Sequence, residues 1–131
     1  MAKRRYKSKL AKVLESHDTN TYETTYDDCK KWFNILNREL FQNKLPPVDE
    51  IDIRWRRGSL AYYTSLMDDK DPSYKRNLLA MNKKYKSKKF FVEVLAHEMV
   101  HHWQFMNDLP TNHGETFQMW DEKLRRKGIK I

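Results

Sequence analysis

The stretch KKFFVEVLAHEMVHHWQFMN, residues 88–107, decides the fold of this sequence and carries its most informative motif. Apolar residues run along its whole length, and Ser87 immediately before it suits the N-cap of a helix. The segment Leu109-Pro110-Thr111-Asn112 then breaks the pattern, because proline cannot continue a helix. The sequence therefore predicts one long helix from about Lys88 to Asn107.

Residues 97–101 of this helix read His-Glu-Met-Val-His. Positions four apart lie only about 40° apart around a helix axis, so the imidazoles of His97 and His101 can converge on one cation. Glu98 lies beside that face, where its carboxylate can act as a general base without occupying the metal. An HExxH pattern on a helix is typical of a metalloprotease, and neutral imidazole is a good zinc ligand.

Two exposed histidines on a charged helix are the competing interpretation of this pattern. Leu95-Ala96 and Met99-Val100 flank the motif, so this face of the helix should turn toward the core. Imidazole and carboxylate groups on a buried face need partners that satisfy them. The apolar flanks therefore favour a metal site over a solvated surface.

A third metal ligand must come from outside this helix, and the sequence offers two sources. Asp121 and Glu122 lie about twenty residues after the second histidine, at the spacing that gluzincin-type sites use. His113 follows the helix-breaking loop, and Gly114 beside it gives the chain freedom to turn sharply. We favour His113 because an imidazole matches the other two ligands.

The longer pattern HExxHxxGxxH, which is typical of metzincins, is absent from this sequence. Gln104 stands at the position of its glycine and Asn107 at that of its last histidine. His102 points about 100° away from His101 around the helix, which predicts contact with solvent or with groups behind the ligands.

The rest of the chain predicts a small α+β domain around this helix. Apolar steps of three and four predict an N-terminal helix that begins after Tyr22 and ends before Leu45-Pro46. A last helix is expected from about Gly114 to Lys127, with Gly128 as the residue that ends it. Three strands are expected in a mainly antiparallel sheet: Val48–Trp55, Ser59–Leu66 and Asn77–Met81, with a loop over Met67–Ser73.

Composition restricts the class of protein. The chain has 131 residues, 39% of them hydrophobic and 13% aromatic, which fits one domain with a packed core. Its one cysteine, Cys29, excludes an internal disulfide and a four-cysteine zinc ribbon. No run approaches the roughly 18 apolar residues of a spanning helix, so we expect a cytoplasmic protein without a membrane partner. The aromatic residues expected in the core are Trp55, Trp103, Phe105, Phe117 and Trp120.

The charge balance favours polyanionic partners. With 26 basic and 18 acidic residues, the chain has a formal net charge of +8. Six basic residues fall within the first twelve positions, so residues 1–20 are interpreted as a basic arm and residues 21–131 as the domain. Lys and Arg can hold phosphates while nearby tyrosines stack on bases. The candidate DNA contacts are Lys3, Arg4, Arg5, Arg56, Arg57, Lys83, Lys84 and Lys86.

Two segments resemble the SprT-like metalloprotease domain, whose eukaryotic relatives include Spartan. One is HEMVH followed by a short loop and HGETF, residues 113–117; the other is FNILNRELFQNKLP, residues 33–46, before a strand that ends in Trp55. The resemblance covers about Tyr22 to Lys127. It implies a small zincin-like fold in which His97, His101 and His113 bind one zinc ion, with manganese as an alternative. Glu98 then activates water.

Members of that family are DNA-dependent proteases that remove proteins crosslinked or tightly bound to DNA. The resemblance therefore implies a peptidase acting on DNA-bound proteins. We expect it to be a monomer and to be associated with the nucleoid when it is bound to DNA. The four-cysteine ribbon of many bacterial members is missing, so DNA contacts would come from the domain and its basic arm. The alternatives are a DNA-binding or host-interaction module with little or no proteolysis, and a zinc hydrolase that does not cleave proteins.

The strand Ser59–Leu66 is the expected binding edge for an extended peptide, because polar Ser59, Thr64 and Ser65 accompany Tyr62 and Tyr63. A tyrosine hydroxyl close to the metal could stabilise the oxyanion, which makes these two tyrosines candidates. Simple packing or solvent exposure is the alternative for both.

Overall fold

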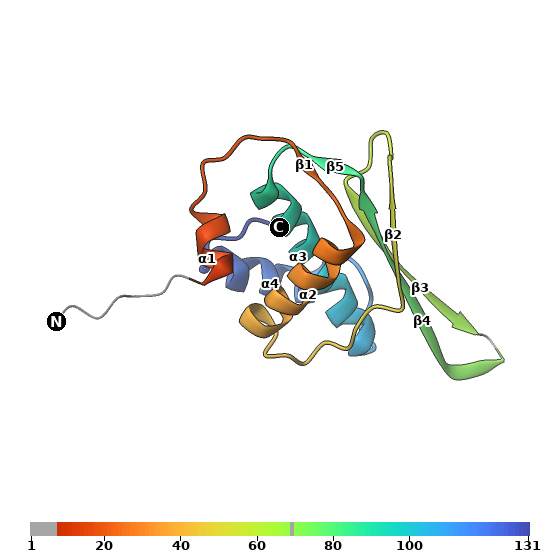
Figure 1. Ribbon diagram of the computed structural model, residues 1–131. Coiled ribbons are helices and arrows are strands. Elements are labelled where there is room, and N and C mark those ends of the chain that lie inside the picture. The colour runs from red at the N-terminus through yellow and green to blue at the C-terminus, as the bar shows by residue number, and fades with distance from the viewer. Residues whose placement is uncertain (1–7, 69) are drawn as a thin grey trace.

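Helices packed against one side of a twisted sheet make up the protein, as a computed structural model shows (Figure 1). The structure describes residues 8–68 and 70–131. The helices are α1 (Lys9–Leu14), α2 (Tyr26–Leu40), α3 (Lys88–Met106) and α4 (Glu115–Arg125). The predicted α+β class is confirmed, and so is the long helix that carries HExxH. No helix among the described residues is long and apolar enough to cross a membrane.

The main sheet contains β2 (Glu50–Arg54), β3 (Ala61–Asp68) and β4 (Asp71–Asn82), in the order β2-β4-β3. β3 and β4 form an antiparallel hairpin, so most of the loop expected over Met67–Ser73 is strand. β2 pairs parallel to β4, which makes the sheet mixed. Because β4 lies in the centre, β3 is an edge strand, as expected for the segment Ser59–Leu66.

A second, two-stranded sheet was missed by sequence reasoning. β1 (Tyr22–Glu23) pairs antiparallel with β5 (Lys84–Tyr85). Two-residue strands carry no periodicity, so nothing in the sequence pattern could reveal this pairing. It ties the entrance of α2 to the segment that leads into α3.

The core lies between α2, α3 and α4. α2 contributes Trp32 and Leu36, and α3 contributes Phe91, Leu95 and Met99, all nearly inaccessible to solvent. Phe105, Phe117 and Trp120 are buried and Trp103 is partly buried, as expected.

Trp55 was expected in the core and this expectation is wrong, because 67% of its surface is exposed. Trp55 was predicted to be buried because it follows Ile51 and Ile53 at steps of two residues, as on one face of a strand. β2 ends at Arg54, however, and the chain turns away through Gly58, which has φ +78°. Outside the pleat of the strand, the alternation no longer fixes which way Trp55 points.

Part of the expected basic arm packs against the domain. Ser8 caps α1 by accepting a hydrogen bond from the Ala11 amide, and Leu10 and Val13 of this helix are buried in the core. The arm residues Lys3, Arg4 and Arg5 lie outside the described residues.

The loop between α3 and α4 depends on Gly114 for a reason other than the expected one. Its φ of −80° is ordinary for any residue. The amide of Gly114 instead donates to Asn112 Oδ1 at 2.9 Å, and a Cβ at this position would lie 2.9 Å from the same oxygen. A side chain would therefore push Asn112 away from the start of α4.

The end of α4 follows the expected pattern. Gly128 adopts φ +87°, and the amide of Ile129 donates to the Leu124 carbonyl in a Schellman motif. This turn sends residues 129–131 back across α3, where Ile129 is fully buried.

Candidate metal centre

Three histidine side chains converge between α3 and the start of α4. His97 and His101 project from successive turns of α3, and His113 ends the loop before α4. One ring nitrogen from each lies within 4.8 Å of the others, and Nε2 of His97 is 3.2 Å from Nε2 of His113. Zinc–nitrogen bonds of about 2.0–2.1 Å in a tetrahedral site place two ligand nitrogens about 3.3 Å apart. Nε2 of His97 and Nε2 of His113 therefore lie at the spacing of two zinc ligands, and the three histidines together could hold one metal ion.

Hydrogen bonds on the far side of two rings orient them toward that position. Nδ1 of His97 lies 2.8 Å from the main-chain oxygen of Ile131, and Nδ1 of His101 lies 2.9 Å from Oε1 of Gln104. Both oxygens can only accept, so each Nδ1 carries the hydrogen and each Nε2 keeps its lone pair for a metal.

Burial also keeps these imidazoles in the form that binds a metal. It lowers the pKa of both His97 and His101, and the nearby imidazoles lower them further. Neutral imidazole is the ligand form, so less free energy is needed to release protons when zinc binds.

Phe117 forms the floor of the centre. Its ring centroid lies 4.9 Å from that of His97, 5.3 Å from that of His101 and 4.6 Å from that of His113. Phe117 is buried on the first turns of α4. The three imidazole rings, two from α3 and one from the loop before α4, therefore pack against one apolar surface.

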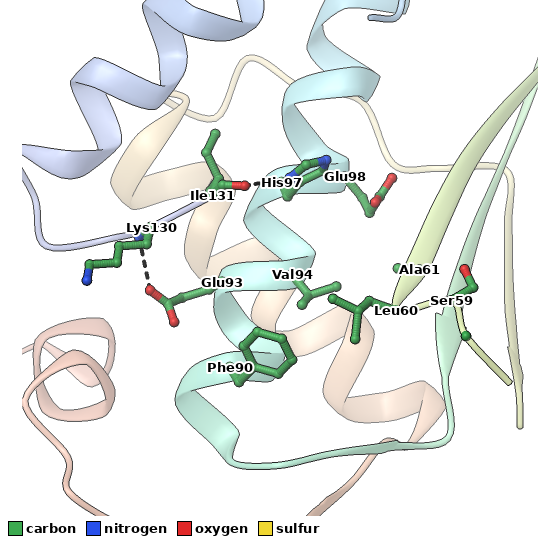
Figure 2. A pocket seen from close by; sticks show the side chains of 11 residues that line it. Ser59, Leu60, Ala61, Phe90, Glu93, Val94, His97, Glu98, Lys130 and Ile131 are labelled. Atoms are coloured by element: carbon green, nitrogen blue, oxygen red, sulfur yellow. Dashed lines mark hydrogen bonds between the residues drawn. The ribbon is translucent and has the colours of Figure 1, made fainter. Parts of the chain in front are cut away.

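Glu98 lines a cavity next to His97 instead of joining the ligand trio. Figure 2 shows its carboxylate pointing into the space between α3 and β3. Only 6% of the residue is exposed, and this burial raises the pKa of the carboxyl group to about 7. A general base works best when its pKa lies near the operating pH, which suits Glu98 for proton transfer.

Gln104 links the two ligand-bearing elements and was missed by sequence reasoning, which noted it only as a mismatch with another motif. Its side chain is fully buried. While Oε1 holds His101, Nε2 donates to the Asn112 carbonyl at 3.0 Å and to Thr116 Oγ1 at 2.9 Å. Its position three residues after His101, on the same helix face, was the available signal.

We expect Gln104→Met to weaken zinc binding by about 10–100-fold, the usual effect of losing an outer-shell partner. The apolar side chain keeps the volume but removes the acceptor for His101 and the donor to Asn112 in the loop and Thr116 on α4. Competition with a chromogenic chelator measures the affinity, and Gln42→Met, at an exposed position, is the control. Wild-type affinity in a folded Gln104→Met protein would contradict this role.

The alternative ligands are engaged elsewhere on α4. Asp121 forms an ion pair with Arg125 at 3.1 Å, and Glu122 pairs with Arg126 at 2.7 Å. Among the described residues, the metal-binding cluster contains the three histidines and neither of these acids.

His102 and the two candidate tyrosines lie away from the ligand face. His102 is fully buried, with Nδ1 2.8 Å from the Tyr63 hydroxyl and Nε2 2.7 Å from the Pro46 carbonyl oxygen. Tyr63 thus holds β3 against α3. Tyr62 alternates to the opposite face of the strand, where the Arg56 guanidinium lies 4.8 Å from its ring centroid.

The candidate DNA contacts fall into two groups. Arg56 is largely committed within the domain, since it pairs with Asp52 at 2.8 Å and only 15% of its side chain is exposed. Arg57 is exposed, as are Lys83, Lys84 and Lys86 in and around β5. Lys84 lies 3.9 Å from Glu23, and Lys86 lies 4.4 Å from the ring centroid of Phe90.

Three features define a zincin-like, metallopeptidase-like domain. These are the HExxH motif on α3, a third histidine just before α4 and the edge strand β3 beside α3. The family model of the SprT-like family matches residues 29–131, and the chain belongs to that family. No curated protein sequence matches the chain.

Proposed function

We propose that this protein is a zinc-dependent peptidase that hydrolyses peptide bonds with Glu98 as its general base. The observation that carries the proposal is the joint placement of two features. Three imidazoles converge closely enough to hold one metal ion, with two of their nitrogens 3.2 Å apart, and a buried carboxylate with a raised pKa lines the cavity beside them. The all-imidazole donor set favours zinc over manganese, which prefers oxygen ligands.

Each part of the site has a chemical task in this reaction. Zinc, when bound by the three histidines, supplies a Lewis acid that polarises the scissile carbonyl and makes water more acidic. Glu98 accepts a proton from the attacking water and delivers it to the leaving amine. β3 lies at the edge of the sheet formed by the described residues, where an extended peptide can pair with it.

We further propose that the substrates are proteins bound or crosslinked to DNA. The net charge of +8 supports this partner, and so does a groove between the end of α2, α3 and α4. The groove has a volume of about 600 Å³, and its lining includes Trp103 and four basic residues but no carboxylate. The basic residues are Lys44, Lys123, Arg126 and Lys127.

Casein or histone should be degraded by the zinc-loaded protein, and faster when single-stranded DNA is present. The affinity for single-stranded DNA should fall by about 50-fold between 50 and 200 mM salt if four phosphates are contacted. Lys123→Gln combined with Arg126→Gln should weaken binding and flatten this salt dependence, whereas Lys30→Gln combined with Lys31→Gln, at exposed positions of α2, is the matched control. DNA binding without any Glu98-dependent cleavage would favour the alternative of a binding module.

A further inference from the structure

A cavity of about 390 Å³ opens beside Glu98, between α3 and the start of β3 (Figure 2). Leu60 and Ala61 line it from the strand side, and Phe90 and Val94 line it from the helix side. Its inner end reaches His97 and Glu98, so a group that enters the cavity lies next to the reacting centre. A pocket of this size with mostly apolar walls suits one side chain of a bound peptide.

The strand-side wall is held in place by buried polar groups. The Asn82 side-chain amide donates to the carbonyls of Arg56 and Ser59, both at 2.9 Å. The Tyr85 hydroxyl donates to the Leu60 carbonyl at 2.6 Å. Since Asn82 and Tyr85 are themselves buried, the wall exists before any ligand binds.

Leu60 is an exposed apolar residue at the mouth of this cavity. Its relative exposure is 53%, although its backbone is fixed by the bond from Tyr85. A leucine held in place while exposed to solvent offers apolar area that a ligand can cover, which is a favourable contact.

Two charged residues, Glu93 and Lys130, line the outer end of the cavity and bond to each other. Glu93 Oε2 accepts a hydrogen bond from the Lys130 amide at 2.9 Å, as Figure 2 shows. The next residue, Ile131, gives its main-chain oxygen to His97. These bonds fasten residues 130 and 131 over α3 and leave Leu60, Ala61, Phe90 and Val94 as the surface available to a side chain.

We propose that this cavity binds an apolar side chain of the substrate residue next to the scissile bond. It thereby selects the peptide bond at which the protein cleaves its substrate. The proposal rests on the proposed peptidase function, and it names Leu60 as a residue that determines specificity. Leucine-like or phenylalanine-like residues fit these walls, whereas glycine leaves them uncovered and a carboxylate would meet Glu98.

Binding of small zinc-directed probes tests the cavity without any need for turnover. The probes are N-acetylated leucine, glycine and lysine hydroxamates, titrated calorimetrically into the zinc-loaded protein. The leucine probe should bind at least about tenfold more tightly than the glycine probe. Leu60→Ser should reduce this ratio to below about threefold. Tyr26→Ser replaces an apolar residue of similar exposure, 49%, on the far helix α2 and should preserve the ratio.

Equal binding of the leucine and glycine probes overturns the proposal, as does preference for the lysine probe or a ratio that Leu60→Ser leaves unchanged. Mass-spectrometric mapping of casein fragments, with Glu98→Gln as the blank, separates the two proposals. Leucine preference in binding without Glu98-dependent cleavage would retain the cavity and reject the peptidase. Glu98-dependent cleavage with no apolar bias in sites or probes would retain the peptidase and reject the cavity.

Discussion

Replacing Glu98 with glutamine should abolish peptide cleavage while leaving zinc binding and the fold intact. The amide has nearly the shape of the carboxylate but cannot accept the proton of the attacking water. General acid–base groups contribute about 10²–10⁴-fold to rate, so we expect kcat/KM to fall by at least about 100-fold. Glu98 is only 6% exposed, and a buried ionisable group is costly to the folded state. Replacing it with a neutral amide should therefore not lower the stability of the protein.

A fluorogenic peptide assay measures this loss, while zinc content and thermal unfolding of the same preparation report on the site and the fold. Glu23→Gln, at an exposed position of β1, is the matched control and should keep full activity. Cleavage that survives in Glu98→Gln would refute the role assigned to Glu98. Lost cleavage together with lost zinc would show that the side chain maintains the metal site instead.

The helix that bears the motif could be predicted because its information is local. The 3.6-residue period places His97 and His101 on one face and Glu98 beside them without reference to any other segment. Ser87 and Pro110 set its limits in the same local way. The cap of α4 was equally readable, since Gly128 takes the positive φ that a Schellman motif needs.

Features that depend on pairing between distant segments could not be read in this way. The sequence of β2 contains no signal that it pairs parallel to β4. Likewise, the residues around Tyr85 contain no signal that they pair with the strand of Tyr22. Trp55 was misplaced because a short alternating run does not reveal where its strand ends. Gln104 was overlooked because two of its three hydrogen bonds reach Asn112 in the loop and Thr116 on α4, whose positions only the tertiary fold defines.

His113→Ala should remove most of the zinc affinity, with little effect on the metal-free fold. His113 is exposed, so its side chain contributes little to packing, but it supplies one of the three nitrogens that converge in the cluster. Loss of an outer-shell partner already costs about 10–100-fold in affinity, so losing a ligand should cost at least about 100-fold. At a zinc concentration 100 times the wild-type Kd, binding stabilises the native state by about 2.7 kcal/mol. The same concentration would equal the Kd of the variant and stabilise it by only about 0.4 kcal/mol.

Thermal unfolding with and without zinc makes that difference visible, beside metal analysis of the purified proteins. At roughly 3–5 °C per kcal/mol for a chain of this size, zinc should raise the Tm of wild type by about 10 °C and that of His113→Ala by only about 1–2 °C. His17→Ala, at another exposed histidine, should respond like wild type. Unchanged zinc occupancy in His113→Ala would reject it as the third ligand and move that role to Asp121 or Glu122. Either acid would first have to leave its ion pair with Arg125 or Arg126, so Asp121→Asn and Glu122→Gln would then identify which one binds the metal.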